Sequence, residues 1–237
     1  TIPVYAVSYP FAMELLTREE LSMSMNVTTK TEKLTSHNVI AETKTGNPDN
    51  IVMMGSHLDS VEDGPGINDN GSGSAAILEV AIKMQKVKTN NKLRFAWWSA
   101  EELGLVGSTK YVESLNDSEK SKIALYLNFD MIASKNYQLG VYDGDGSKHQ
   151  TPGPAGSAAI EQLFHMYYSM NGPASVEVPL NGRSDYGAFA AAGIPVGGSF
   201  TGAEGAKTEE EAKLYGGEAG LPYDACYHKS CDNLENI

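Results

Sequence analysis

Histidine and carboxylate side chains stand directly after three predicted strands of this 237-residue chain. His57 follows the first of these strands, the pair Glu101-Glu102 follows the second, and Asp130 ends the third. In open α/β sheets the loops at the carboxyl ends of the strands converge on one crevice, so we expect these side chains to meet there. Imidazole and carboxylate groups are common zinc ligands. The spacing therefore predicts a metal site at one edge of a sheet.

A further carboxylate lies two residues after His57. Side chains two apart along an extended segment point to the same side, so Asp59 can accept a hydrogen bond from the His57 imidazole and orient its other nitrogen toward a metal. Taken alone, a histidine and an aspartate at this spacing are more typical of a surface pair. The metal-binding interpretation of this pair therefore depends on the other candidate ligands.

The acids of the neighbouring loops have both a metal-binding and a structural interpretation. Asp69 lies in the glycine-rich turn 66–73, where the backbone can approach an ion closely, but the same residues suit an ordinary turn before a helix. Glu101 and Glu102 can face a substrate and a metal, yet two acids at a helix start also favour the helix dipole. Asp130, buried after an apolar strand, needs either a cation or backbone N–H donors.

Two cysteines, Cys226 and Cys231, enclose a short loop that contains Tyr227 and His228. If oxidised, this pair would remove roughly 2 kcal/mol of unfolded-state freedom and help to hold the two enclosed side chains. A zinc knuckle that uses both cysteines is the alternative, but a second cysteine pair is missing from the sequence.

The elements that must position these residues alternate between strands and helices. Apolar runs predict strands, and apolar residues at helical spacing predict helices. The expected strands are residues 1–7, 38–43, 51–56, 93–98, 124–130 and 193–200, and the expected helices are residues 12–21, 73–87, 104–112 and 155–170. A turn at 46–50 is expected to join the second and third strands as a β-hairpin. The alternation indicates an α/β domain with a largely parallel inner sheet.

Composition narrows the function classes. The formal net charge is −12 and no run of Lys or Arg occurs, which argues against binding nucleic acid through its phosphates. No stretch approaches the roughly 20 apolar residues of a membrane helix. Sequons at Asn26 and Asn116 would suit a secreted glycoprotein.

The ordered motifs resemble those of the dizinc aminopeptidases of the M28 peptidase family. The resemblance runs from about residue 36 to residue 237, and spaced blocks in the correct order make it specific. The blocks are His57-Leu-Asp, Asn68-Asp-Asn-Gly-Ser-Gly, Ala100-Glu-Glu-Leu-Gly-Leu-Val-Gly-Ser, Asn128-Phe-Asp-Met, Gly182-Arg-Ser-Asp-Tyr and Cys226-Tyr-His. The resemblance implies a three-layer α/β/α sandwich with a mixed, centrally parallel sheet, the zinc-peptidase (phosphorylase/hydrolase-like) fold.

The resemblance also implies a ligand set for two zinc ions. One ion would take His57 and Asp130. The other would take Glu102 and His228, with the carboxylate of Asp69 bridging both. All five positions carry the residue types of the family, which disfavours the inactive, receptor-like relatives. Carboxylate-rich dinuclear sites also accept cobalt or manganese.

Catalytic roles follow from the resemblance in the same way. Glu101 would be the general base that takes a proton from the attacking water and delivers it to the leaving amine. Tyr227 would donate to the oxyanion, and Asp59 would support His57. Arg183 matches a substrate-contacting arginine of the family, although a surface ion pair is its alternative.

Other positions are assigned by the same comparison of motifs. The Asp69–Asn70 peptide bond is expected to be cis, as in similar enzymes, and Asp185 is expected to be structural. Phe200 and Tyr227 are candidates for the substrate pocket. The remaining histidines match no ligand position of the family and are interpreted as ordinary polar residues: His37, His149 and His165.

The resulting hypothesis is a secreted, extracellular aminopeptidase that acts on peptides with a free N-terminus, with a preference for leucine-like residues implied by the relatives. A carboxypeptidase or other amidohydrolase on the same scaffold is the rival enzyme, but it would need a basic pocket, and only Arg183 lies near a motif. A non-catalytic, receptor-like binding module is the rival from another class.

Domain organisation is also inferred from the resemblance. Residues 1–28 look like the tail of the protease-associated (PA) domain that some family members insert, and residues 29–237 look like the catalytic domain without its N-terminal helix. We therefore expect the chain to be a fragment of a longer precursor, with the missing N-terminal piece bound alongside it.

Overall fold

The computed structural model describes residues 6–237, and the chain divides into two compact units, Thr1–Thr35 and Ser36–Ile237. The first unit contains helix α1, Tyr9–Leu16, in which a proline occupies the first turn. The helix expected at 12–21 therefore begins and ends earlier. The strand expected at 1–7 falls largely outside the described residues. The unit boundary lies seven residues after the domain boundary expected at residue 28, and the assignment to a PA domain stays a prediction.

The second unit alternates strands and helices, as expected. Its strands are β1 Val39–Glu42, β2 Asn47–His57, β3 Asn91–Trp98, β4 Ile123–Phe129, β5 Gly140–Tyr142, β6 Val176–Val178 and β7 Val196–Phe200. Its helices are η1 Ile67–Ser72, α2 Gly73–Met84, α3 Val106–Ser114, α4 Asp117–Ser121, α5 Ser157–Asn171, α6 Tyr186–Ala191 and α7 Glu209–Tyr215.

The strands form one sheet in the order β1-β3-β2-β4-β7-β5-β6. The neighbours β3, β2, β4 and β7 are parallel, whereas β1 and β5 run antiparallel to β3 and β7. This confirms the mixed, centrally parallel sheet. The expected hairpin of β1 and β2 is wrong, because β3 lies between them and pairs with both. The extended chain at 47–50 belongs to β2, where the register with β3 shifts between Asn47 and Ile51.

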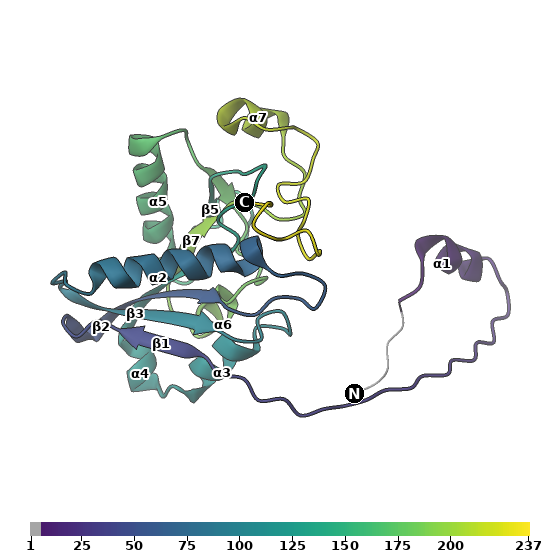
Figure 1. The fold of residues 1–237 in the computed structure, drawn as a ribbon, viewed down its shortest axis with the longest axis horizontal. Helices are drawn as coiled ribbons and strands as arrows, with labels where there is room; N and C mark the ends of the chain where they lie inside the picture. The colour runs from purple at the N-terminus through teal and green to yellow at the C-terminus, as the bar shows by residue number, and fades with distance from the viewer. Residues whose placement is uncertain (1–5) are drawn as a thin grey trace. The chain divides into compact units, whose positions relative to one another are not determined.

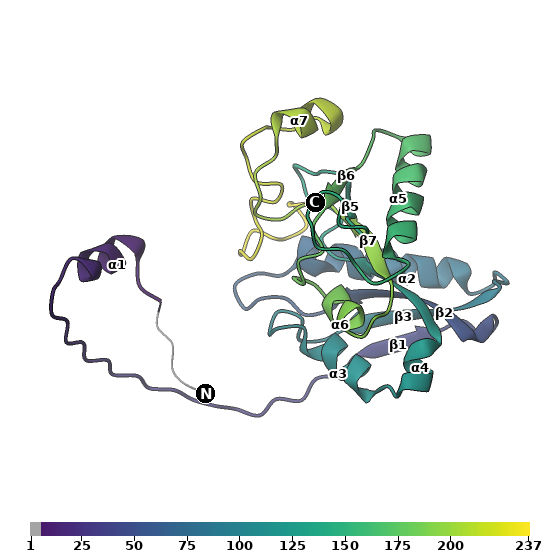
Figure 2. The same ribbon diagram turned by 180° about the vertical axis from the view of Figure 1, so that it is seen from behind.

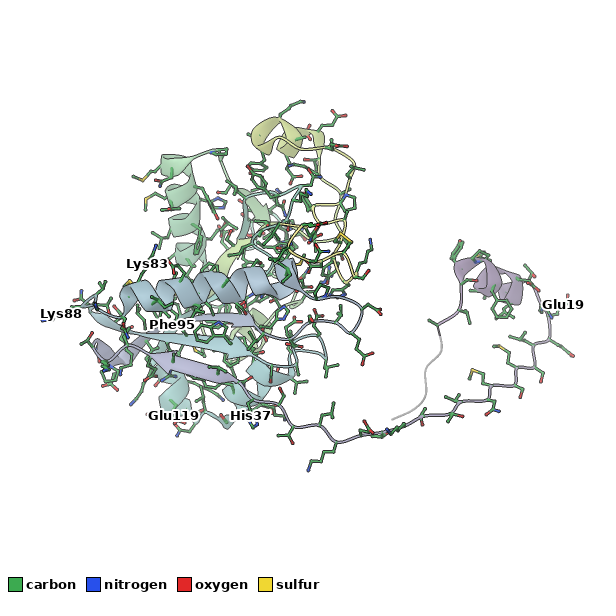
Figure 3. All side chains as sticks on the ribbon, in the orientation of Figure 1. Glu19, His37, Lys83, Lys88, Phe95 and Glu119 are labelled. Carbon is green, nitrogen blue, oxygen red and sulfur yellow. A yellow bond between two sulfur atoms is a disulfide. The ribbon has the colours of Figure 1, made fainter. Side chains whose placement is uncertain are left out.

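Helices cover both faces of the sheet, which makes the three-layer sandwich (Figures 1 and 2). On one face, Ile77 of α2 packs on Phe95 and Trp97 of β3, and Phe95 is labelled in Figure 3. On the other face, Trp98 packs with Phe189 of α6. The two faces follow directly from alternation along the strand, since Trp97 and Trp98 are adjacent and point in opposite directions.

The core next to the carboxyl ends of the parallel strands is aromatic and tightly packed. The rings of Tyr126 and Phe189 stack with centroids 3.9 Å apart, and Trp98 donates from Nε1 to the hydroxyl of Tyr126 at 2.8 Å. Gly55 lies against this pair, and a Cβ added there would meet the Tyr126 hydroxyl at 2.1 Å. The close approach fixes β2, which ends two residues later at His57.

Several short elements had no periodic signal in the sequence. These are the three-residue strands β5 and β6 and the helices α4, α6 and α7. Three residues cannot show an alternation, and α4 and α7 begin at capping boxes built on Asn116 and Thr208 rather than at an apolar stripe. Within residues 6–237, no helix combines the length and apolarity needed to cross a membrane.

Candidate metal centre

The parallel register brings His57 and Asp130 to the same level of the sheet. Gly55 on β2 pairs with Asn128 on β4, so the residues two positions further along both strands lie side by side at the carboxyl edge. His57 also pairs with Trp98 at the end of β3, which places the following turn with Glu101 and Glu102 against the imidazole. Strand pairing alone thus brings together His57 and Asp130, which are more than seventy residues apart in the sequence.

Asp69 is carried by the turn η1, in which Asp69 and Asn70 leave helical geometry and the peptide bond between them is cis. The expected cis bond is confirmed. Asn70 is buried and spans the gap to β4, since its Nδ2 donates to the carbonyl of Phe129 at 3.0 Å. The turn is therefore fixed to the strand that leads to Asp130.

The side chain of Asp69 lies between two histidines. Its Oδ1 is 3.1 Å from His57 Nε2, and its Oδ2 is 3.2 Å from His228 Nε2. On the far sides, His57 Nε2 is 3.3 Å from Asp130 Oδ1 and His228 Nε2 is 3.2 Å from Glu102 Oε2. Each imidazole thus has one carboxylate of its own and shares the third, which makes two adjacent groups of donors.

The donor set fits divalent cations. Glu102 Oε1 and Asp130 Oδ1 are buried with no hydrogen-bond partner among the described residues. Burial, and then the carboxylate of Asp69, raises the pKa of Glu102 to about 7. Burial lowers the pKa of His57, but the carboxylates around it, Asp130 first, raise that pKa well above its usual value. A bound cation would favour the ionised carboxylates and neutral imidazoles that these contacts require.

Glu101 lies beside this cluster and is 9% exposed. Burial, and then the carboxylate of Asp130, raises its pKa to about 9, although His57 opposes the shift. The side chain of Asp59 accepts hydrogen bonds from the backbone N–H groups of Glu101 at 3.0 Å and Glu102 at 3.3 Å. Asp59 therefore holds the turn that carries both glutamates.

The contact of Asp59 with His57 differs from the expected one. His57 Nδ1 is 3.0 Å from the backbone carbonyl of Asp59 and 3.7 Å from its carboxylate. The expected carboxylate–imidazole hydrogen bond is wrong, because the carboxylate is taken by the backbone of the following loop. The carbonyl still orients the ring so that Nε2 points toward Asp69 and Asp130.

Cys226 and Cys231 form a disulfide, which confirms the expected pairing and excludes a knuckle that uses both thiolates. Within the closed loop the rings of Tyr227 and His228 stack at 3.8 Å. Burial, and then the charge of Asp69, raises the pKa of Tyr227 to about 12. Its hydroxyl therefore keeps its proton at neutral pH and can act as a donor.

Arg183 was expected to be either a substrate-contacting residue or part of a surface ion pair, and its contacts are compatible with both. The Arg183 side chain is 57% exposed, and its guanidinium pairs with Glu204 Oε1 at 2.7 Å, as expected of a surface ion pair. The same group donates to the hydroxyl of Tyr227 at 3.3 Å, which brings it to the site.

Asp185, expected to be structural, is 1% exposed at the start of α6. The neighbouring Ser184 donates to Asp130 Oδ2 at 2.6 Å.

Two buried aspartates near the C-terminus were not singled out from the sequence. Asp232 accepts from the backbone N–H groups of Asn68 at 2.8 Å and Asp69 at 3.0 Å. Asp224 accepts from Asn68 Nδ2 at 2.6 Å, and Asn236 Nδ2 donates to both aspartates. This network joins the turn of Asp69 to the loop of His228. The position of Asp232 directly after Cys231 was the available signal.

Replacing Asp232 by alanine is expected to lower the free energy of unfolding by about 3 kcal/mol, because the N–H groups of Asn68 and Asp69 lose their acceptor. It should also weaken zinc binding by about 10- to 100-fold, as loss of outer support for a metal ligand does. Urea denaturation and equilibrium dialysis measure the two effects. Asp63, which is exposed, provides the matched Asp63→Ala control. Equal values for the two variants would show that the network does not support the turn.

A pocket of about 310 Å³ opens beside the cluster. Its lining includes Asp69, Glu101, Glu102, Asp130 and His228. Its apolar and aromatic lining residues include Leu105, Met131, Tyr142, Val178, Pro179, Ala203 and the two pocket candidates from the sequence, Phe200 and Tyr227. Arg183 also lines the pocket.

The histidine–carboxylate cluster thus lies at the carboxyl edge of the parallel strands of an α/β/α sandwich, where ligand sites of open α/β sheets form. The model of peptidase family M28 matches residues 38–237. Because this match covers most of the chain, the protein belongs to peptidase family M28.

Individual relatives agree with the family. The aminopeptidase of Pseudomonas aeruginosa strain UCBPP-PA14 is 53% identical over 236 residues, which are 100% of this chain and 44% of the relative. Leucine aminopeptidase 2 of Arthroderma otae is 53% identical over 223 residues, 94% of this chain and 45% of the relative. The chain thus spans less than half the length of these curated relatives.

Solved structures show the same fold. An aminopeptidase from Aneurinibacillus sp. strain AM-1 superposes with a TM-score of 0.66 at 35% identity, covering 85% of this chain and 43% of that chain. A zinc aminopeptidase from Bacillus subtilis superposes with a TM-score of 0.65 at 30% identity, covering 84% of this chain and 45% of that chain.

Proposed function

We propose that this chain is the catalytic part of a secreted aminopeptidase that uses two zinc ions to hydrolyse the N-terminal peptide bond of peptides. The observation that carries the proposal is the position of Asp69, whose two oxygens face His57 and His228 at 3.1 and 3.2 Å beside the pocket. The relatives named above as aminopeptidases, one of them a zinc aminopeptidase, support both the reaction and the metal.

The two groups of donors would each hold one ion. His57 and Asp130 would bind the first and His228 and Glu102 the second, with Asp69 shared between them. When bound, a pair of zinc ions lowers the pKa of a water molecule and polarises the carbonyl that the water attacks.

The chain's own residues would handle the protons. The charge of the bound cations would keep Glu101 ionised although burial raises its pKa. Its carboxylate would accept the proton of the attacking water and pass it to the nitrogen of the leaving amine. Tyr227 would donate a hydrogen bond from its hydroxyl to the carbonyl oxygen as negative charge develops there. Arg183 contacts the Tyr227 hydroxyl at 3.3 Å, so it would help to hold that donor in position.

The pocket favours a substrate with a free α-amine and an apolar first side chain. Its acidic wall attracts an ammonium group, and the apolar wall suits a leucine-like side chain. A carboxypeptidase would need an available cation, but the guanidinium of Arg183 is already paired with Glu204. Secretion is supported by the Cys226–Cys231 disulfide, because such bonds persist in oxidising compartments.

Leucine p-nitroanilide and its N-acetylated counterpart test the proposal together. We expect chelator-sensitive hydrolysis of the free amine and at least a 100-fold lower kcat/KM for the acetylated compound, because acetylation removes the positive charge. Comparable rates on both compounds would contradict an aminopeptidase and favour the amidohydrolase reading. Absence of turnover on either compound, in a zinc-loaded protein, would favour the binding module.

A further inference from the structure

A second group of metal-binding side chains lies outside the pocket, where α5 packs near the edge strand β6. Glu161 and His165 are four residues apart on α5 and therefore lie on one side of the helix, and Glu177 lies on β6. One ligand atom from each of these three residues lies within 4.8 Å of the others. We call these three residues the α5–β6 cluster.

The ring of His165 is oriented as a metal ligand would be. Its Nδ1 is 2.7 Å from the hydroxyl of Ser175, a contact that fixes the ring and aims its other nitrogen. That nitrogen, Nε2, is buried and has no hydrogen-bond partner in the described part of the chain. It faces Glu161 Oε1 at 3.6 Å, which is longer than a hydrogen bond.

Glu161 is 5% exposed and turns one specific oxygen to the cluster. Its Oε2 accepts the backbone N–H groups of Gly144 at 2.9 Å and Asp145 at 3.1 Å, which leaves Oε1 directed at His165. Two donors that each lie about 2.1 Å from a tetrahedral ion are about 3.4 Å apart. The 3.6 Å separation is close to this value, and the corresponding separations in the metal centre are 3.1–3.3 Å.

Two further carboxylates, Asp143 and Asp145, lie near Glu161. Burial, and then the neighbouring carboxylates Asp145 and Asp143, raises the pKa of Glu161, although the two backbone N–H groups oppose the shift. Asp143 itself is satisfied, because it accepts the N–H groups of Ser147 at 3.0 Å and of the next two residues. The loop backbone therefore accounts for Asp143, whereas Glu161 Oε1 is turned toward His165 Nε2.

We propose that the α5–β6 cluster is a third divalent-cation site, separate from the catalytic pair, with His165 Nε2, Glu161 Oε1 and the Glu177 carboxylate as ligands. One imidazole and two carboxylates suit zinc or a similar ion, and water completes the shell because His165 and Glu177 are half-buried. The ion would fasten α5 to the edge strand β6. His165 is then more than the ordinary polar residue inferred from the sequence.

Zinc stoichiometry tests this site independently of the catalytic function. After equilibrium dialysis against buffered Zn²⁺, the variants His165→Gln and Glu177→Gln should each hold about one zinc ion fewer per chain than the wild type, while hydrolysis of leucine p-nitroanilide stays unchanged. His149→Gln is the matched control, because the His149 ring contacts the Glu177 carbonyl at 3.1 Å and belongs to no ligand set. A full zinc complement in either folded variant would overturn the proposal.

A second measurement tests the α5–β6 cluster in a variant whose proposed catalytic site is disrupted. In an Asp69→Ala background, which lacks the shared ligand, zinc should still raise Tm, because an ion that binds only the folded state stabilises it. Adding His165→Gln should abolish that remaining rise. An equal zinc-dependent increase in Tm with and without His165 would show that the ion binds elsewhere, and it would overturn the proposed site. This outcome does not depend on whether the aminopeptidase proposal is correct.

Discussion

Replacement of Glu101 by glutamine is expected to lower kcat for leucine p-nitroanilide by about 100- to 10,000-fold, the usual effect of losing a general base. Glutamine keeps the size of the side chain but cannot accept a proton. The backbone of residue 101 stays anchored to Asp59, so the turn and the adjacent ligand Glu102 keep their places. Steady-state kinetics measure kcat, and the zinc content is determined on the same preparation.

The zinc content separates a chemical effect from a structural one. Glu101→Gln should bind as much zinc as the wild type, because Glu101 is not among the proposed ligands. Glu210, exposed on α7, supplies the control Glu210→Gln, for which no change in kcat is expected. A Glu101→Gln enzyme with full zinc and wild-type kcat would remove Glu101 from the proton transfer.

The structure brings the candidate ligands together as expected, because the signals that mark them in the sequence are local. His57, Glu102 and Asp130 follow strands, Asp69 lies in a glycine-rich turn and His228 lies in the disulfide loop. The apolar runs of β2, β3 and β4 are long enough to be recognised. Parallel pairing then needs no further information to bring His57 level with Asp130. The disulfide was equally readable, since Cys226 and Cys231 have no other cysteine to pair with.

The parts that the sequence did not predict depend on contacts between distant residues. The order of β1, β3 and β2 is set by the register of β3 with both neighbours, and nothing in the β1–β2 turn distinguishes this order from a hairpin. Asp232 and Asn68 are 164 residues apart. The spacing of Glu161 and His165 is equally common in any exposed helix, and only the folded position of Glu177 gives it meaning.

Removal of the catalytic ions with a chelator is expected to lower Tm by roughly 8–16 °C for each ion that was present at a thousand times its Kd. Such binding contributes about 4 kcal/mol, and a domain of this size loses about 2–4 °C for each kcal/mol. The effect has a direct structural cause. Without cations, the carboxylates of Asp69, Glu102 and Asp130 repel one another, and two of their oxygens are buried with no hydrogen-bond partner in the described chain.

Differential scanning calorimetry with chelator, and again after zinc is returned, measures this loss and its reversal. The Asp69→Ala variant should lose most of the chelator-dependent shift, because it lacks the ligand that both ions would share. His37, exposed and outside the proposed ligand sets, gives the control His37→Ala, which should keep the whole shift. A wild-type Tm that does not respond to chelation would mean that the buried carboxylates are compensated by protonation rather than by cations, and the two-zinc proposal would fall with it.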